Sequence, residues 1–313
     1  MLFRSASGFC VLDNDFSPQQ YGGARAEDSR AVTAAHEFFH AIQFGYDYLD
    51  DRWFLESTAT WMEDQFADSI NDNRQYLSTG QVAVPSTPLD LSDSNAISMY
   101  GNWAWWEFLT ERYGRDLVRK VWTKAGNFPG GGYTYSTAAL KKVLSSHGGF
   151  AANYRNFSAA NNAPGTFYSE GSAWPSAAVT ATSTVANATP ISRSTSLDHL
   201  TAADYRFVPS SGLTTTKAVV SVTGASAAVP QAAVVIRKVG GKTKVVSVPL
   251  TNGSGQVTIS FSPSTVERAT VTLVNASTAF TGCTTNAQTA STWSCGGTPS
   301  GDNQPFSLTF TAN

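Results

Sequence analysis

The residues best suited to chemistry lie in one apolar segment, "AAHEFFHAIQFGYD", which spans residues 34–47. It contains two of the four histidines of the chain, His36 and His40, and places Glu37 directly after the first. Residues four apart on an α-helix differ by about 40° around the axis, so both imidazoles would project from one face. Two imidazoles so placed can bind one zinc ion, and a carboxylate beside them can take a proton from water. The H-E-x-x-H spacing therefore predicts one zinc ion held by His36 and His40, with Glu37 as the general base.

The competing interpretation is that both histidines belong to the core and satisfy their ring nitrogens with hydrogen bonds. The complete motif lies in a stretch without Pro or Gly that follows an acidic turn, which is typical of a helix. A zinc ion in a hydrolase takes three protein ligands and leaves one position open. The next candidate ligands are Glu56 and Glu63, in "WFLESTATWMEDQF". Three aspartates between the two segments are expected to be solvated turn residues: Asp47, Asp50 and Asp51.

The segment around Glu56 resembles a known family. The zinc peptidases called gluzincins place a third ligand, a Glu, on a second helix within the pattern N-E-G-x-A-x-Y, and "LESTATW" lies on that pattern. The resemblance implies that Glu56 is the third zinc ligand, although Leu55 and Ser57 replace the Asn and Gly of the pattern. The stretch from Cys10 to Trp122 is also similar to uncharacterised secreted bacterial proteins classed as metalloproteases.

Glu63 and Tyr100 could support the reaction from outside the ligand set. Glu63 follows Glu56 by two helical turns and could hold a ligand imidazole through its second ring nitrogen. Alternatively, Glu63 is a surface charge beside Asp64. In the aminopeptidase branch a Tyr at a helix start stabilises the oxyanion, and "MYGNWAWWEFLTERYG" is similar, which implies that role for Tyr100. Trp103 replaces a Gly of that pattern, and Tyr100 could instead be an aromatic residue packed on the core.

Together these residues predict a zinc-dependent peptidase that acts on a protein or peptide substrate. A strand over residues 8–13, "GFCVLD", could pair with an extended substrate as an edge strand, which favours an endopeptidase. Asp13 and Asp15 could bind calcium, but "DND" after a strand is typical of an ordinary turn. Two other functions stay open. One is a degenerate zincin that binds surfaces through its C-terminal sandwich, and the other is a zinc hydrolase of a non-peptide bond.

The elements that must position these residues divide the chain in two, and the fold class is α+β. Residues 1–170 predict a mainly helical catalytic domain, which the resemblance implies is zincin-like, and residues 200–313 predict an all-β, antiparallel sandwich. Residues 171–199 predict a connector, whose Ser/Thr/Ala stretch could also be an irregular strand region. The expected helices cover residues 28–45, 53–70, 98–114, 116–126, 136–149 and 151–162. The expected strands alternate Val, Ile, Thr and Ser and cover residues 204–210, 217–224, 232–241, 244–255, 256–262, 268–277 and 306–312.

The composition indicates a secreted protein. Only 14% of the residues are charged and the net charge is −2, which gives no indication of a nucleic-acid or membrane partner. No apolar run is long enough to span a bilayer, and no feature specifies an oligomeric state. Cys283 and Cys295 lie close together in a Thr/Ser-rich loop and predict a disulfide, which leaves Cys10 over. The first residues do not form a signal peptide, so we expect the export signal and a partner for Cys10 to precede residue 1.

Overall fold

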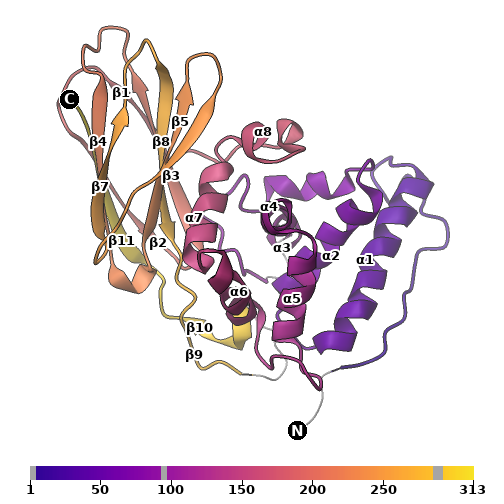
Figure 1. The fold of residues 1–313 in the computed structure, drawn as a ribbon. Coiled ribbons are helices and arrows are strands. Elements are labelled where there is room, and N and C mark those ends of the chain that lie inside the picture. Colours follow the sequence, from indigo (N-terminus) through magenta and orange to yellow (C-terminus); the bar gives the residue numbers. More distant parts are fainter. Residues whose placement is uncertain (1–4, 93–96, 285–291) are drawn as a thin grey trace. The chain divides into compact units, whose positions relative to one another are not determined.

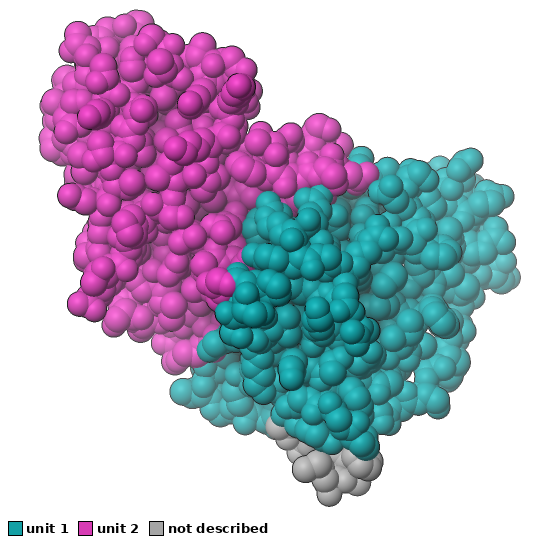
Figure 2. Space-filling view, in the orientation of Figure 1, with its two compact units in different colours: residues 1–80, 89–147, 280–298 teal, residues 81–88, 148–279, 299–313 magenta. Residues whose placement is uncertain are grey.

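The computed structural model describes residues 5–92, 97–284 and 292–313 (Figure 1). The chain divides into two compact units, which Figure 2 distinguishes by colour. Unit 1 comprises Met1–Gly80, Leu89–His147 and Phe280–Thr298, and unit 2 comprises Gln81–Pro88, Gly148–Ala279 and Pro299–Asn313. The division therefore differs from the predicted boundaries at residues 170 and 200, because the last helices of the first half belong to the unit that contains the sheets.

Unit 1 is helical, as predicted for the first part of the chain. Its helices are α1 (Ala26–Asp47), α2 (Arg52–Ala67), α3 (Ser98–Gly101), α4 (Trp103–Tyr113), α5 (Asp116–Ala125) and α6 (Ser136–Leu144), with 3₁₀ turns η1 (Asp72–Ser78), η2 (Ser145–His147) and η6 (Ser294–Gly296). The helix predicted over residues 98–114 is divided at Asn102, whose ψ of 6° is not helical. The buried side-chain amide of Asn102 donates to the carbonyl oxygen of Leu89 at 2.8 Å, which holds the chain at this break.

Helices α1 and α2 lie side by side in unit 1 (Figure 1). An aromatic core fixes the rotation of α2 about its own axis: the rings of Phe54 and Trp122 are buried and stack with centroids 3.9 Å apart. The indole N–H of Trp106 donates to Oγ of Ser57 at 2.8 Å. Aromatic pairs of this kind contribute about 0.5–1.5 kcal/mol beyond their burial. With Phe54 and Ser57 turned into the core, Glu56 lies at the edge of that face and meets α1.

The strand predicted over residues 8–13 is wrong, since this described segment has no strand pairing. Just before it, the backbone N–H of Ala6 donates to the carbonyl oxygen of Phe44 on α1 at 2.8 Å. A Cβ at Gly8 would lie 2.8 Å from the Cα of Ala41, so only glycine permits this close approach to the helix. Gly8 thus approaches α1 closely, whereas Phe9 and Val11 of the apolar run are exposed. The edge-strand argument for an endopeptidase is lost.

Unit 2 contains two β-sheets packed as a sandwich, and every strand predicted beyond residue 200 is present. The sheet orders are β1-β3-β8-β5-β6 and β2-β11-β4-β7. The strands of these sheets are β1 (Ala181–Val185), β2 (Ile191–Leu197), β3 (Thr201–Pro209), β4 (Lys217–Gly224), β5 (Gln231–Lys238), β6 (Thr243–Ser247), β7 (Ser254–Ser260), β8 (Val266–Asn275) and β11 (Gln304–Ala312). A short pair outside the two sheets joins β9 (Phe280–Thr281) to β10 (Thr298–Pro299), and β9 belongs to unit 1. Buried rings of both sheets form the core, where Phe207 and Phe310 stack with centroids 4.1 Å apart.

The predicted connector over residues 171–199 is wrong in part, because it contains β1 and β2. Both strands are rich in Ser and Thr and alternate exposed with half-buried residues, so they lack the apolar signal of the other strands. β1 also pairs in parallel with β3, so the sandwich is not wholly antiparallel. Unit 2 further contains α7 (Phe150–Ala160), α8 (Pro164–Phe167) and the 3₁₀ turns η3 (Gly171–Ala173) and η4 (Ser226–Ala228). On α7, Ala159 packs on Ala233 and Val235 of β5, which explains why this helix belongs with the sheets.

Cys283 and Cys295 form the predicted disulfide, whereas Cys10 is free and exposed. Cys295 lies in a segment of unit 1, and the backbone N–H of Cys295 donates to Oδ1 of Asp51 at 2.7 Å. The neighbouring N–H of Ser294 donates to Asp90 at 3.1 Å. Among the helices of the described residues, none is long and apolar enough to cross a membrane.

Candidate metal centre

Helices α1 and α2 bring the three predicted ligands together. The Nε2 atoms of His36 and His40 lie 3.3 Å and 3.4 Å from the same atom, Oε2 of Glu56. The three side chains are half-buried, and each offers one ligand atom within 4.8 Å of the other two. The short connection between the helices makes them neighbours, and the four-residue spacing of the histidines places both on the face of α1 toward α2. This arrangement could hold one metal ion.

The other ring nitrogen of each histidine is bound by a buried side chain. Nδ1 of His36 lies 2.6 Å from Oε1 of Glu63, and Nδ1 of His40 lies 2.6 Å from Oε1 of Gln43. Glu63 is only 6% exposed, so the alternative that it is a surface charge is wrong. A hydrogen bond at Nδ1 orients the ring and leaves Nε2 directed at the metal position, as is usual for metal-binding histidines.

Gln43 was missed by the sequence reasoning, although its position three residues after His40 on one helix face is a usable signal. Its side chain is fully buried, and its amide nitrogen donates to the carbonyl oxygen of Leu55 at 2.9 Å and to Oγ1 of Thr58 at 2.8 Å. These two bonds identify the nitrogen end of the amide, so the oxygen end faces His40. Gln43 therefore links the orientation of His40 to the backbone of α2.

Burial and the paired charges shift the ionisation of these groups. Burial lowers the pKa of His36, but hydrogen bonds and negative charge from Glu56 and Glu63 outweigh it and raise the pKa to about 9. Burial favours neutral Glu56, but the hydrogen bonds of His36 and His40 outweigh it and hold the pKa of Glu56 well below its usual range. Burial raises the pKa of Glu63, although the bond to His36 opposes this. Without a metal ion, a proton on His36 thus supplies positive charge beside Glu56 at neutral pH.

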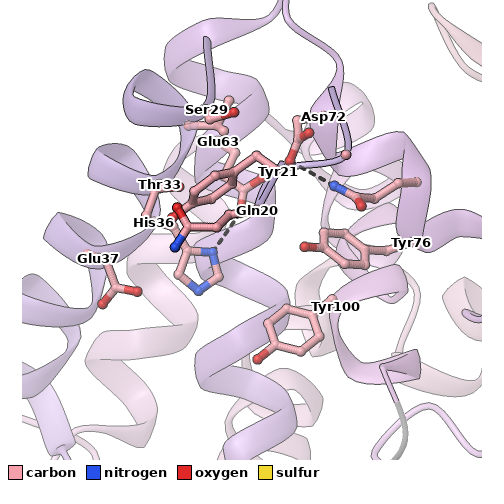
Figure 3. A pocket seen from close by; sticks show the side chains of 13 residues that line it. Gln20, Tyr21, Ser29, Thr33, His36, Glu37, Glu63, Asp72, Tyr76 and Tyr100 are labelled. Atoms are coloured by element: carbon pink, nitrogen blue, oxygen red, sulfur yellow. Dashed lines mark hydrogen bonds and ion pairs between the residues drawn. The ribbon is translucent and has the colours of Figure 1, made fainter. Parts of the chain in front are cut away.

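A pocket of about 480 Å³ opens beside His36, and both Glu37 and Tyr100 line it (Figure 3). Glu37 follows His36 on α1, and its half-buried carboxylate stands at the edge of this pocket. Tyr100 comes from α3, and its ring centroid lies 6.1 Å from that of His36. Burial, followed by the negative charge of Glu56, raises the pKa of Tyr100, so its hydroxyl lies within the influence of the ligand cluster. Its ring centroid lies 5.3 Å from that of Tyr76. The five residues predicted as ligands, base and oxyanion donor therefore lie in one site: His36, Glu37, His40, Glu56 and Tyr100.

A second pocket lies beside His40 and has a different character. It is lined by Phe44, Tyr48, Leu55 and Arg52 together with two of the candidate ligands. Nε of Arg52 lies 3.6 Å from Oε1 of Glu56, the oxygen that does not face the histidines. One side of the candidate metal position is thus apolar with a single cation.

The expectation of solvated turn residues at Asp47, Asp50 and Asp51 is wrong, since each is at most 1% exposed. Asp51 accepts hydrogen bonds from the hydroxyl of Ser136 and the backbone of Cys295, both far away in the sequence. Burial, followed by the negative charge of Asp50, raises the pKa of Asp51. These aspartates therefore belong to the packing of unit 1, between the end of α1 and the start of α2.

Asp13 and Asp15, the residues considered for calcium, form turn hydrogen bonds. Oδ1 of Asp13 accepts the backbone N–H of Asp15 at 3.0 Å, and Oδ1 of Asp15 accepts that of Ser17 at 3.2 Å. The ordinary-turn interpretation of "DND" accounts for its geometry.

The remaining histidines have other partners: His147 packs on the ring of Tyr113, and His199 is bonded to Asp302.

Comparison with known proteins gives a family match over part of the chain. A family of unknown function, DUF6055, matches residues 21–129, which include all five candidate residues. No curated protein matches the chain. Among solved structures, the pre-peptidase C-terminal domain of a collagenase from Bacillus anthracis is similar, with 9% identity and a TM-score of 0.25. The match covers 42% of this chain and 94% of that chain. The 4-O-methyl-α-glucuronidase BtGH115A, of family GH115, is similar with 9% identity and a TM-score of 0.18. The match covers 93% of this chain and 40% of that chain.

Proposed function

We propose that the chain is a secreted zinc-dependent peptidase whose helical unit is zincin-like, with His36, His40 and Glu56 as the ligands of one zinc ion. The spacing of the donor atoms carries this proposal. Tetrahedral ligands at about 2.0–2.1 Å from zinc stand about 3.3–3.4 Å from one another. The two Nε2 atoms lie 3.3 Å and 3.4 Å from Oε2 of Glu56, which agrees with the edges of such a tetrahedron.

The same distances argue against hydrogen bonding as the main interaction between the two Nε2 atoms and the carboxylate of Glu56. A charge-assisted bond between nitrogen and a carboxylate is usually about 2.7–2.9 Å long. The bonds at the two Nδ1 atoms, both 2.6 Å, are as short as or shorter than that, whereas the contacts at Nε2 are longer. Short hydrogen bonds at Nδ1 thus hold both imidazoles in place. The two Nε2 atoms and Oε2 of Glu56 are spaced for an ion between them.

The residues of the chain would share the chemistry as follows. When bound, zinc acidifies water and polarises the peptide carbonyl. Glu37 takes the proton from the attacking water and delivers it to the leaving amine. The hydroxyl of Tyr100 donates to the carbonyl oxygen as it becomes negative. Glu63 and Gln43 hold the two imidazoles in one orientation throughout.

Secretion is supported by the disulfide between Cys283 and Cys295, because such bonds persist mainly in oxidising compartments. Residues 8–13 form no edge strand, so the proposal covers cleavage within a chain as well as cleavage at a chain end. The half-buried carboxylate of Glu37 lines the pocket beside His36. We therefore propose a peptidase without assigning it to either class.

One experiment tests the proposal on three proteins: the natural chain, Glu37→Gln and Glu56→Ala. Zinc is measured by elemental analysis, and cleavage of a peptide mixture is followed by mass spectrometry. We expect about one zinc per chain in the natural protein and in Glu37→Gln. Only the natural protein should cleave peptides. Glu56→Ala should bind zinc more weakly. Absence of zinc from the natural protein would refute the metal site. Zinc without cleavage of any peptide would favour a non-peptide hydrolase or a degenerate zincin that serves as a binding protein.

A further inference from the structure

The pocket beside His36 is strongly acidic. Three carboxylates line it, from Glu37 on α1, Glu63 on α2 and Asp72 on η1. No lysine or arginine lines it in the part of the chain that the structure describes. Its volume of about 480 Å³ lies within the range of small-ligand pockets. A pocket with this charge attracts positively charged groups and repels negative ones.

One buried carboxylate oxygen in this pocket lacks a partner. Glu63 is 6% exposed and binds His36 through Oε1, whereas its Oε2 is buried and has no hydrogen-bond partner within the described residues. Asp72 lines the same pocket as Glu63 and brings a second carboxylate to it. A buried acceptor without a donor and two neighbouring like charges both cost free energy. A cationic ligand with N–H donors would relieve both costs at once.

The negative charge of the site persists when a divalent metal is counted. Four carboxylates surround the candidate metal position and this pocket: Glu37, Glu56, Glu63 and Asp72. A divalent ion balances two of these charges. The nearby cation, Arg52, lines the other pocket and pairs with Glu56. The surplus negative charge therefore lies on the His36 side.

Aromatic faces complete the pocket. Tyr21, Tyr76 and Tyr100 line it (Figure 3), and the ring centroid of Tyr100 lies 6.1 Å from that of His36. Tyrosine rings attract ammonium and guanidinium groups through cation–π interactions within about 6 Å. Carboxylates together with aromatic rings form a suitable site for an alkylammonium or guanidinium group and offer little to an anion.

We propose that this pocket selects substrates by a positive charge next to the cleaved bond. The charge belongs either to a Lys or Arg side chain or to the free amino terminus of a peptide. This inference rests on the proposed peptidase function for its substrate class. The carboxylates of Asp72 and Glu63 contact the cation, and Asp72 is the specificity residue that does not touch a candidate metal ligand.

The first test is equilibrium binding to the zinc-loaded full chain, measured by calorimetry with two matched pairs of probes. Acetyl-arginine methylamide against acetyl-citrulline methylamide tests a side-chain cation, and alaninamide against acetyl-alaninamide tests a terminal ammonium. We expect the charged member of at least one pair to bind about tenfold or more tightly than its neutral partner. The pair that discriminates identifies the source of the charge. Equal binding within both pairs would overturn the proposal.

Variants assign the preference to this pocket. Asp72→Asn removes one charge without changing shape, and we expect the ratio of the two affinities to fall by about threefold or more. Glu63→Gln keeps an acceptor for His36 and should lower the ratio likewise. Glu111→Gln removes an exposed charge outside the pocket and should leave the ratio as it is. An undiminished ratio in both pocket variants would refute the assignment.

A cleavage assay separates this inference from the proposed function. In a peptide that the protein cleaves, each residue flanking the bond is replaced by Lys or by Gln, and kcat/KM values are compared. We expect at least one position where Lys exceeds Gln about tenfold. Cleavage without any such preference would overturn the cation pocket and leave the peptidase standing. Selective binding of the charged probes by a protein that cleaves no peptide would leave the pocket and remove the peptidase.

Discussion

Nδ1 of His40 lies 2.6 Å from Oε1 of Gln43, and the amide nitrogen of Gln43 donates to the backbone carbonyl of Leu55 at 2.9 Å. The residue next to Leu55 is Glu56, the third member of the ligand cluster. One buried amide thus connects a candidate ligand on α1 to the backbone beside a candidate ligand on α2. The relative position of the two helices and the direction of His40 are set by the same side chain.

Gln43→Ala should therefore weaken zinc binding about 10- to 100-fold, the usual effect of losing a residue that orients a metal ligand. The substitution frees the His40 ring and removes the bond from the Gln43 amide to the carbonyl of Leu55. Competition with a chromophoric chelator measures the affinity. Gln19→Ala, the same change at an exposed residue, is the control and should bind zinc as the natural protein does. Unchanged affinity in Gln43→Ala would contradict the role given to this amide.

Tyr100→Phe should lower kcat by about 10²- to 10³-fold and leave the zinc content at its natural level. The reason is that the hydroxyl near Arg52 and Glu56 is removed, whereas the ring that packs near Tyr76 stays. Steady-state kinetics on a cleaved peptide, with elemental analysis of the same sample, measures both quantities. Tyr133→Phe removes a hydroxyl from an exposed tyrosine and serves as the control. A full kcat in Tyr100→Phe would leave only the packing role for this residue.

Zinc binding should grow stronger as pH rises toward about 9, because Glu56 and Glu63 raise the pKa of His36 to about that value. The metal must displace the proton on His36, so below that pKa the apparent affinity gains about tenfold per pH unit and then levels off. Calorimetry in buffers of different ionisation enthalpy should show about one proton released per zinc at neutral pH. No proton release would show that His36 is neutral before the metal binds.

The metal-free protein should show the opposite trend in stability. The folded pKa of His36 is raised from 6.5 to about 9, so its contribution to the free energy of unfolding is fully present below about pH 6.5 and is lost as pH rises through about 9. Urea unfolding of the chelator-treated protein across this range measures the slope. His36→Gln should remove most of that slope. A natural protein whose stability rises with pH over this window would contradict the ion pair with Glu56 and Glu63.

Loss of the disulfide should destabilise unit 1. Cys283→Ser opens a loop with a sequence separation of 12, and removing a bridge of this size costs about 3 kcal/mol in the chain-entropy model. The effect should reach α2, since the backbone of Cys295 donates to Asp51 directly before that helix. Urea unfolding with and without a reducing agent measures the loss. Cys10→Ser changes the free, exposed cysteine and should have the stability of the natural protein in both conditions.

Local pattern was enough to predict the elements that carry the site. The apolar period of residues 28–45 and 53–70 predicts α1 and α2, and strands such as Lys217–Gly224 follow from alternation. The spacing of His36 and His40 predicts that they share a face, because four residues make about one helical turn. Glu56 could be placed near them through a resemblance, since only a short turn separates the two helices.

Contacts between residues far apart in the sequence were decided only by the tertiary structure. Periodicity reports which face of an element is buried, but it does not say which partner buries it. Asp51 is buried because Ser136 and Cys295 cover it, and nothing near Asp51 in the sequence reveals this. For a related reason the pattern around β1 and β2 indicated only a connector or an irregular strand region, since their Ser/Thr pattern becomes a strand signal only beside the strands that pair with them.

The sequence by itself thus determined which residues could bind a metal and on which two helices they lie. The tertiary structure decided how those residues are held and what surrounds them. It turned Glu63 inward to His36, recruited Gln43, and placed Asp72 in the same pocket as Glu63. The physical reason is that ligand spacing along a helix is a local property, whereas the charge and shape of a pocket arise from packing of separate elements.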